Sequence, residues 1–237
     1  MTIRKMIMIQ CGLLLPLLGP AGAQAQSAPA DLPPGWPREG ATLLVENDRG
    51  AAYNVLYFKD KPTAMHRHRY FFAGLDLNTA SVSVQRPGET KWSPPNPVVK
   101  DRMWYLPKDL THAEMTTTDP GRHTVVIDIK DKSVPEAANT TGFPAGKYAP
   151  FQTKVVDNDR VIIWDCAWSA RPGEVSFDSR DMFIAFAEGG DLSIAIPGQP
   201  ARIQHYEAGQ AIFLPGGHAR TITAKSGAIR AMLVEVK

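Results

Sequence analysis

Two histidines separated by a single residue are the clearest chemical signal in this sequence. His66 and His68 flank Arg67 just before an aromatic segment that begins at Tyr70. Side chains two residues apart on a strand point to the same face. An extended segment here would therefore allow both imidazoles to bind one ion. Neutral imidazole is a common ligand of divalent transition metals, and we expect Fe, Zn, Ni or Mn.

A third imidazole must come from another part of the chain, and His112 is the candidate. It follows a predicted strand end and turn that contain Pro107. Three neutral donors would leave a divalent ion with positions open for water or substrate. The sequence therefore predicts a metal site formed by His66, His68 and His112.

Three further residues are candidates for contact with a bound ligand. Tyr70 follows the histidine pair and could orient an anion, and Trp104 is a strand aromatic that could stack on a sugar or an aromatic ring. His218 lies in a glycine-rich turn of the second half of the chain. The aromatic side chains also have a structural explanation, since aromatic residues in strands usually pack in the core.

The same pattern also permits a site without metal. A His-x-His pair arises by chance, and the flanking Arg67 and Arg69 would suit an exposed polar strand. A metal-free pocket for a small ligand is therefore retained as the alternative.

The elements that must position these residues follow an internal repeat. The segment VENDR at 45–49 recurs as VDNDR at 156–160, and MWYLP at 103–107 matches AIFLP at 211–215 in character. Similar strand-like segments occur in the same order in both halves. Duplication of one structural unit explains this order.

Short apolar segments separated by glycine and proline fill both halves. The chain contains 19 Gly and 20 Pro, and no long segment has sustained helical periodicity. This spacing predicts an all-β protein with an antiparallel sandwich or barrel in each half. We expect the two barrels at 41–131 and 151–237, joined by a linker at 132–150.

The first residues have the pattern of an export signal. Arg4 and Lys5 precede a mostly apolar run over 6–18, and small residues follow at 21–25. This order predicts a cleaved signal peptide over 1–25, followed by an extended leader over 26–40. The expected location is the periplasm or the exterior of the cell. Cys166 would then be the only cysteine of the mature chain, which excludes an internal disulfide.

Composition argues against two classes of partner. The formal net charge is +2 and no basic block is present, so nothing favours binding to nucleic acid. No segment after the predicted signal approaches the ~18 apolar residues of a membrane-spanning helix, and we expect no membrane association after cleavage. The expected partner is a small-molecule ligand or substrate, and a second copy of the chain is a candidate partner through the second barrel.

The histidine pattern resembles the two motifs of the cupin superfamily. The first motif of that family contains His-x-His followed by Glu, and His66 and His68 match the histidine pair. The second motif contains Pro-x-Gly, two residues and His, and Pro107 and His112 match its proline and its histidine. The resemblance covers most of 41–237 and implies two jelly-roll-like cupin barrels in tandem, a bicupin arrangement with degenerate motifs.

The chain departs from the family pattern in both halves. Phe72 or Ala73 stands where the first motif has Glu, so the site would resemble the three-histidine variant of thiol-dioxygenase-like cupins. In the second half, Arg220 stands at the position of the final histidine, and no His-x-His pair precedes it. The resemblance therefore implies one metal site, in the first barrel.

The expected function is that of an exported metal-binding cupin that binds or acts on a small anionic or sugar-like molecule. If the protein is an enzyme, the resemblance implies a metal-dependent isomerase or lyase, or a dioxygenase. The alternative is a periplasmic ligand-binding or stress-response cupin that has no metal and no catalytic activity.

Overall fold

The computed structural model describes residues 32–131, 152–169, 175–178, 180–196, 198–217, 219–226 and 228–237. These residues form strands joined by turns and loops, and none of them is helical. The strands of every sheet pair in antiparallel fashion. The prediction of an all-β antiparallel protein is therefore confirmed. The predicted signal peptide at 1–25 and linker at 132–150 lie outside the described residues.

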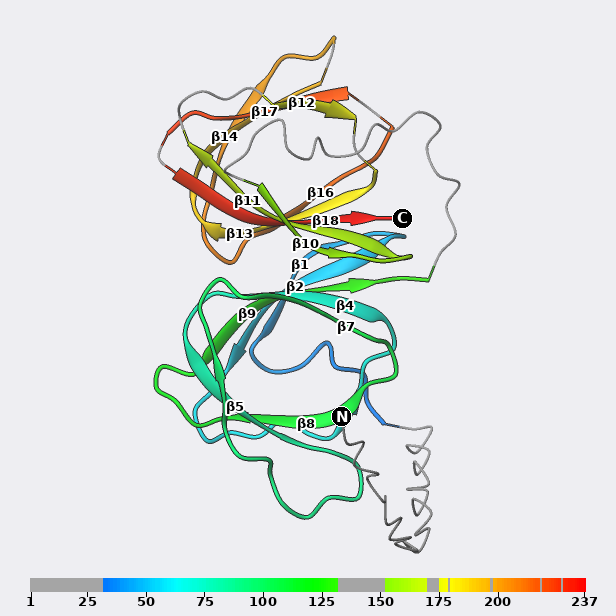
Figure 1. Ribbon diagram of the computed structural model, residues 1–237, viewed down its shortest axis with the longest axis vertical. Coiled ribbons are helices and arrows are strands. Elements are labelled where there is room, and N and C mark those ends of the chain that lie inside the picture. Colours follow the sequence, from blue (N-terminus) through cyan, green and yellow to red (C-terminus); the bar gives the residue numbers. More distant parts are fainter. Residues whose placement is uncertain are drawn as a thin grey trace, which may run out of the picture.

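The first half of the chain, residues 32–131, forms two sheets (Figure 1). The five-stranded sheet has the order β1-β2-β9-β4-β7, with β1 at Ala41–Glu46, β2 at Gly50–Tyr57, β9 at Arg122–Ile129, β4 at Phe71–Asp76 and β7 at Met103–Leu106. The four-stranded sheet has the order β3-β8-β5-β6, with β3 at His66–Arg67, β8 at Thr111–Thr116, β5 at Ala80–Gln85 and β6 at Asn96–Val98.

The second half repeats this strand order. Its five-stranded sheet has the order β10-β11-β18-β13-β16, with β10 at Gln152–Asp157, β11 at Val161–Ser169, β18 at Ala228–Val236, β13 at Met182–Glu188 and β16 at Ala211–Leu214. Its four-stranded sheet has the order β12-β17-β14-β15, with β12 at Val175–Asp178, β17 at Ala219–Ala224, β14 at Gly190–Ala195 and β15 at Arg202–Tyr206. The division into two barrel domains, with the limits given above, stays a prediction.

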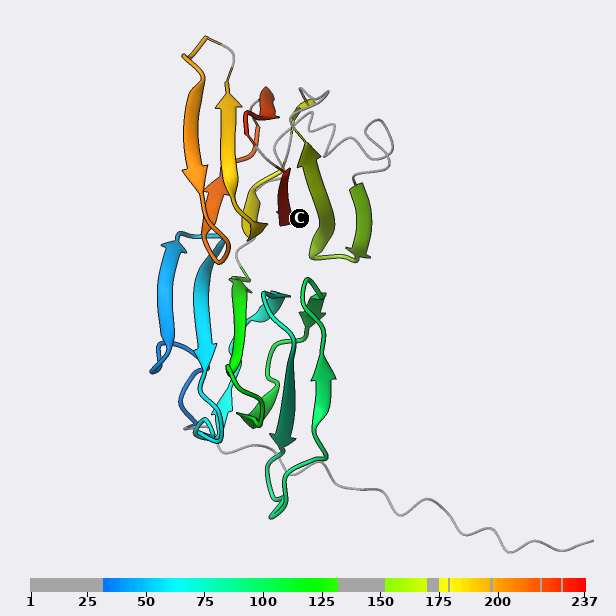
Figure 2. The same ribbon diagram turned by 90° about the vertical axis from the view of Figure 1, so that its left-hand side faces the viewer.

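A shared apolar core joins the two halves. Its members come from both five-stranded sheets, and they include Leu75, Ile127, Ile163, Phe183 and Val234. Figures 1 and 2 show the two halves stacked along the long axis of the molecule, with the five-stranded sheets facing each other. Each of these sheets therefore has both faces covered, one by the shared core and one by the interior of its own half.

Strand β13 shows why the sequence of these sheets is continuously apolar. Met182, Ile184 and Phe186 belong to the core inside the second half, while Phe183 and Ala185 belong to the shared core. Successive side chains of a strand point to opposite faces, so a strand buried on both faces needs apolar residues at every position. The same alternation in the first half turns residues such as Val55, Tyr57 and Phe72 toward the interior, where Phe72 contacts His68.

The end of the predicted leader is part of the folded structure. Trp36 is 5% exposed and packs with Tyr57 and Phe72 inside the first half. The amide of Arg67 in β3 donates a hydrogen bond to the carbonyl oxygen of Pro33 at 2.9 Å. The segment before β1 therefore forms one wall of the first half. Among the described residues there is no helix long and apolar enough to span a membrane.

Candidate metal centre

The three predicted histidines converge inside the first half. His66 lies opposite His112 in the antiparallel pair β3–β8, and His68 follows directly after β3. One candidate ligand atom from each ring can be chosen so that all three lie within 4.8 Å of one another. His66, His68 and His112 are buried residues, 3%, 4% and 6% exposed. The structure thus brings together residues that are up to 46 positions apart in the sequence.

Backbone pairing holds His68 although β3 ends at Arg67. The amide of His68 donates to the carbonyl oxygen of Leu110 at 2.9 Å, and its carbonyl oxygen accepts from the amide of Asp109 at 2.6 Å. On the other side of the strand, the Arg67 guanidinium forms an ion pair with the Asp109 carboxylate. The local backbone is therefore extended enough for the two imidazoles to share one side, as the spacing predicts.

The ring nitrogens have the arrangement that a metal ion requires. Nε2 of His66 lies 3.2 Å from Nε2 of His68. Two nitrogens at about 2.0–2.1 Å from a common tetrahedral ion are about 3.3 Å apart. Nε2 of His112 is buried and has no hydrogen-bond partner among the described residues. The donor set therefore fits a divalent transition metal bound by three imidazoles.

A backbone contact fixes which nitrogen of His66 faces the centre. Nδ1 of His66 lies 2.9 Å from the carbonyl oxygen of Ala64. If Nδ1 carries the proton and donates to this oxygen, Nε2 is left as the free lone pair. Such contacts to the second ring nitrogen are typical of metal-binding histidines because they set the tautomer and the ring orientation.

The environment keeps the three imidazoles neutral. Burial lowers the pKa of His66 and of His112, and burial together with the neighbouring His112 and His66 lowers the pKa of His68 to about 3. The positive charge of Arg38 contributes in the same direction at all three rings. Neutral imidazole is the form that binds metal ions, so the site needs no deprotonation at neutral pH.

Aromatic side chains and a glycine pack tightly around the histidine rings. The ring of Phe72 stacks on His68 with 3.9 Å between centroids, and Trp36 meets His68 edge-on at 5.9 Å. A Cβ atom on Gly35 would lie 2.9 Å from Cε1 of His68 and 3.4 Å from Cδ2 of His66. Only a residue without a side chain fits between the leader segment and the rings at this point.

Glu114 is a carboxylate close to the centre that the sequence analysis missed. It lies two residues after His112 on β8, and its Oε2 is 3.9 Å from Nε2 of His112. Burial opposes ionisation of Glu114, but the neighbouring His112, the charge of Arg122 and a hydrogen bond from Tyr57 outweigh this effect and lower its pKa to about 2. The sequence does contain a cue for Glu114, because His112 and Glu114 have the same two-residue spacing that predicted the His66–His68 pair.

A buried ionic network extends from Glu114 across the interior. The Arg122 guanidinium lies 3.4 Å from Oε1 of Glu114 and 2.8 Å from Oδ1 of Asp76. Oδ2 of Asp76, a fully buried carboxylate, accepts from Arg102 Nε at 3.0 Å and from Trp104 Nε1 at 3.1 Å. Each charged partner is compensated, and the network fixes Glu114 next to the histidines.

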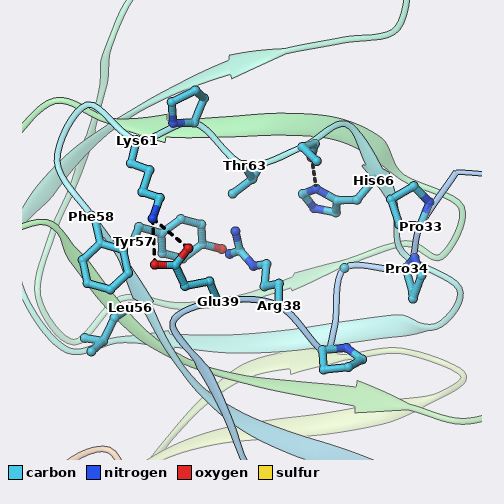
Figure 3. Close-up of a pocket in the computed structure, with 14 residues that line it drawn as sticks. Pro33, Pro34, Arg38, Glu39, Leu56, Tyr57, Phe58, Lys61, Thr63 and His66 are labelled. Carbon is cyan, nitrogen blue, oxygen red and sulfur yellow. Dashed lines mark hydrogen bonds and ion pairs between the residues drawn. The ribbon is translucent and has the colours of Figure 1, made fainter.

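Each of two cavities is lined by part of the histidine cluster. One has a volume of about 230 Å³ and is lined by His66, Arg38 and the leader segment (Figure 3). The other has a volume of about 270 Å³ and is lined by His68, His112, Glu114 and several aromatic side chains. Both volumes are below the roughly 300–1,000 Å³ typical of sites for drug-sized ligands, so they suit a small ligand.

The other predicted contact residues have different positions. Trp104 lines the larger cavity, and its contact with a ligand stays a prediction. Tyr70 lines neither of the two cavities, so its contact with a ligand stays a prediction without support from the fold. His218 lies outside the described residues.

The second half has different residues at the equivalent positions. In the pair β12–β17, which occupies the place of β3–β8, Phe177 is opposite Arg220. The described residues of this half form an apolar core that includes Trp164, Phe186 and Ile222. Within the described part of the chain, the histidine cluster is the one group suited to hold a metal.

Comparison with known proteins identifies the fold. No protein-family model matches the chain, and no curated protein matches it. Solved structures do match, among them a cupin 2 conserved barrel domain protein from Leptotrichia buccalis (TM-score 0.53, 10% identity, 83% of this chain and 88% of that chain). The fold is a cupin fold. AerE from Microcystis aeruginosa is also similar (TM-score 0.59, 11% identity, 83% of this chain and 97% of that chain).

A third similar structure is oxalate decarboxylase from Bacillus subtilis, a protein with Mn(II) centres (TM-score 0.52, 10% identity, 82% of this chain and 74% of that chain). The cupin fold and the histidine cluster together support the metal site predicted from the two motifs. At these levels of identity, the likeness concerns the fold of the chain.

Proposed function

We propose that this protein is an exported metal-binding cupin that binds or acts on a small anionic or sugar-like molecule at its three-histidine centre. The observation that carries this proposal is the convergence of three buried, neutral imidazoles on one point. Buried polar atoms in folded proteins almost always have a partner. A metal ion supplies the partner that Nε2 of His112 lacks among the described residues.

The proposed ion is Fe, Zn, Ni or Mn. The Mn(II) centres of the Bacillus subtilis oxalate decarboxylase support Mn as a member of this set. Glu114 adds an oxygen donor beside the three nitrogens, 3.9 Å from Nε2 of His112. When bound, such an ion acts as a Lewis acid and keeps positions open for substrate.

The residues of the chain determine what can reach the ion. Trp36, Phe72 and Trp104 form an apolar wall of the larger cavity, which suits the ring or carbon chain of a ligand. The polar end of this cavity holds Glu114 and Arg122. Arg122 keeps Glu114 in its carboxylate form, so Glu114 can accept a hydrogen bond from a bound ligand or from water. Open positions on the ion would serve isomerase, lyase or dioxygenase chemistry.

Export is part of this proposal. It is supported by the sequence over 1–25, in which two basic residues, an apolar run and small residues follow one another. A periplasmic or secreted protein would meet small metabolites outside the cytoplasm. A homodimer is proposed as the assembled form.

Thermal shift with metal ions tests the proposal. A ligand that binds only the folded state raises its stability by RT ln(1 + [L]/Kd), which is about 2.7 kcal/mol at a hundredfold excess over Kd. We expect Mn(II), Fe(II), Zn(II) or Ni(II) to raise the melting temperature of the metal-stripped wild type and not that of the His66→Ala/His112→Ala variant. Equal melting temperatures with and without each ion, in a folded wild type, would support the metal-free ligand-binding alternative instead.

A further inference from the structure

The repeated segments VENDR and VDNDR form the same turn in the two halves. The first copy joins β1 to β2, and the second copy joins β10 to β11. In the first turn, Oδ1 of Asn47 accepts a hydrogen bond from the amide of Arg49 at 2.8 Å. In the second turn, Oδ1 of Asn158 accepts one from the amide of Arg160 at 2.9 Å. Each half therefore holds one arginine at the same backbone position.

The side chain of Arg49 crosses from the first half to the second. Its Nε lies 2.9 Å from Oδ2 of Asp181, which directly precedes β13. Its Nη2 donates to the carbonyl oxygens of Val236 at 3.2 Å and Lys237 at 3.3 Å. Figure 1 shows the end of β18 beside β1 and β2. Arg49 is only 6% exposed, so its planar fork binds three acceptors of the other half where water has little access.

Asp181 connects Arg49 to several segments of the second half. Its Oδ1 accepts a hydrogen bond from the amide of Gly216 at 2.7 Å. Its carbonyl oxygen accepts one from the amide of Val236 at 2.8 Å. Asp181 therefore joins the start of β13, the end of β18 and the turn between β16 and β17. Arg49 binds the second half at the point where these three segments meet.

The residue after Arg49 allows the two halves to approach closely. A Cβ atom on Gly50 would lie 2.2 Å from the carbonyl oxygen of Asp128 and 3.0 Å from Cζ of Phe183. Phe183 belongs to the second half and to the shared core. The second copy of the motif has Val161 at this position. The glycine of the first copy therefore lets Phe183 pack against the strand directly beside Arg49.

Arg160 also crosses to the other half, but its surroundings differ. It forms an ion pair with Asp131, and its guanidinium carbon lies 4.7 Å from the ring centroid of Phe71. The side chains of Arg160 and Asp131 are 37% and 35% exposed, against 8% and 22% for Arg49 and Asp181. An exposed ion pair contributes little to stability, whereas loss of one partner of a buried pair is costly. The same backbone position therefore has unequal weight in the two copies.

We infer that Arg49 docks the second half of the chain on the first, with Asp181 as its partner, and that its repeat Arg160 adds little. The shared apolar core attracts the two halves without fixing a direction. A buried guanidinium with three acceptors fixes their relative position, because a planar fork is satisfied in few orientations. This role is independent of the metal centre and gives the first copy of the motif a function in assembly of the two halves.

Urea denaturation of the metal-free full chain tests the inference. Arg49→Gln removes the charge and the fork, and Arg160→Gln is the matched control because it makes the same change at the equivalent position. We expect Arg49→Gln to lower the equilibrium constant of folding on the order of 100-fold. The loss in Arg160→Gln should be less than about fivefold. Equal losses in the two variants would contradict the inference.

A double-mutant cycle tests the assignment of the partner. Asp181→Asn removes the negative charge but keeps an oxygen that can accept from the amide of Gly216. Residues that act as a pair have non-additive effects. The variant Arg49→Gln/Asp181→Asn should therefore lose about as much stability as Arg49→Gln alone. Additive losses would show that Asp181 is not the partner of Arg49.

Amide hydrogen exchange, followed by NMR, separates docking from a local role in the turn. Exchange measures the opening of individual segments of a fold. In Arg49→Gln we expect faster exchange at the amides of Gly216 and Val236, which lie in the second half and depend on Asp181. Arg160→Gln should leave both amides close to the wild-type rates. Faster exchange confined to the turn between β1 and β2 would overturn the docking role.

A second variant covers loss of folding. Should Arg49→Gln fail to give the circular dichroism spectrum of the wild type, Arg49→Lys replaces it, because lysine keeps the charge but has no planar fork. We expect Arg49→Lys to lower the equilibrium constant of folding on the order of tenfold, as for lost hydrogen bonds of a charged group. Stability equal to that of the wild type would contradict a docking role for the arginine fork.

Discussion

His66 lies directly opposite His112 in the β3–β8 pair, and their ring centroids are 4.8 Å apart. In the second half, Phe177 and Arg220 are opposite each other in the equivalent pair β12–β17. The same strand arrangement therefore forms a nitrogen-rich centre in one half and has a different chemical character in the other.

The histidine ligands can be tested one at a time. We expect His66→Ala, His68→Ala and His112→Ala each to weaken metal binding by at least about 100-fold, because loss of a ligand should exceed the 10–100-fold effect of losing an outer-shell partner. The measurement is metal affinity by competition with a chromophoric chelator. His205→Ala is the control, since His205 is 63% exposed and contacts Asp191 far from the centre. A similar loss of affinity in the control would argue for nonspecific binding.

Gly35 gives a test of the wall around the centre. Gly35→Ala places a methyl group within 2.9–3.4 Å of the rings of His68 and His66. The rings or the leader segment must then move, and we expect metal affinity to fall about 10–100-fold, similar to loss of an outer-shell contact. Glu39→Ala, in the same segment but with an exposed side chain, should keep the wild-type affinity. An unchanged affinity in Gly35→Ala would show that the segment does not position the histidines.

The buried network around Asp76 should matter for stability. Asp76→Asn removes the charge that compensates Arg122 and Arg102. Breaking a buried ion pair at one partner typically costs 3–5 kcal/mol, and we expect a loss of about 3 kcal/mol or more in the free energy of unfolding from urea denaturation. Arg86→Gln is the control, because Arg86 is 70% exposed in its pair with Glu89. Its effect should be within about 0.5 kcal/mol. Equal effects of the two substitutions would contradict the importance of the network.

The buried carboxyl group of Asp128 should make the stability of the fold depend on pH. Burial raises the pKa of Asp128 from 3.8 to about 7, although Trp36 and Lys130 oppose the shift. The folded state therefore holds this proton more firmly than the unfolded state, and stability falls as the pH rises from about 4 to 7. Each pKa unit is worth about 1.36 kcal/mol, so the total effect is at most about 4 kcal/mol.

The variant Asp128→Asn isolates this contribution. Its free energy of unfolding, relative to that of the wild type, should increase between pH 5 and pH 8 because the variant has no carboxyl to ionise. Urea denaturation at both pH values measures the difference. A difference that is the same at pH 5 and pH 8 would show that Asp128 has an ordinary pKa in the fold.

Much of the fold could be predicted because its signals are local. Turn residues and alternation of apolar positions predict an all-β chain, and the VENDR and VDNDR segments predict the repeated order of elements. Strand geometry alone predicted that the side chains of His66 and His68 point to the same side. Glu114 could have been found by the same rule, since it has that spacing from His112.

The rest of the site depends on contacts between distant segments. Asp76 and Arg122 are 46 positions apart, and nothing in either local sequence indicates that they form an ion pair. Gly35, Trp36 and Arg38 lie in a proline-rich segment without periodicity, which predicts an extended leader. Only the three-dimensional arrangement shows that this segment packs on β3 and contributes to the centre.

X-ray absorption spectroscopy of the metal-loaded protein separates a three-histidine metal centre from a metal-free pocket. We expect one divalent ion per chain with about three nitrogen ligands at roughly 2.0–2.1 Å, and loss of this signal in the His66→Ala/His68→Ala/His112→Ala variant. A folded protein that retains no stoichiometric metal would contradict the three-histidine centre. The same holds for a nitrogen-coordinated ion that persists after all three histidines are removed.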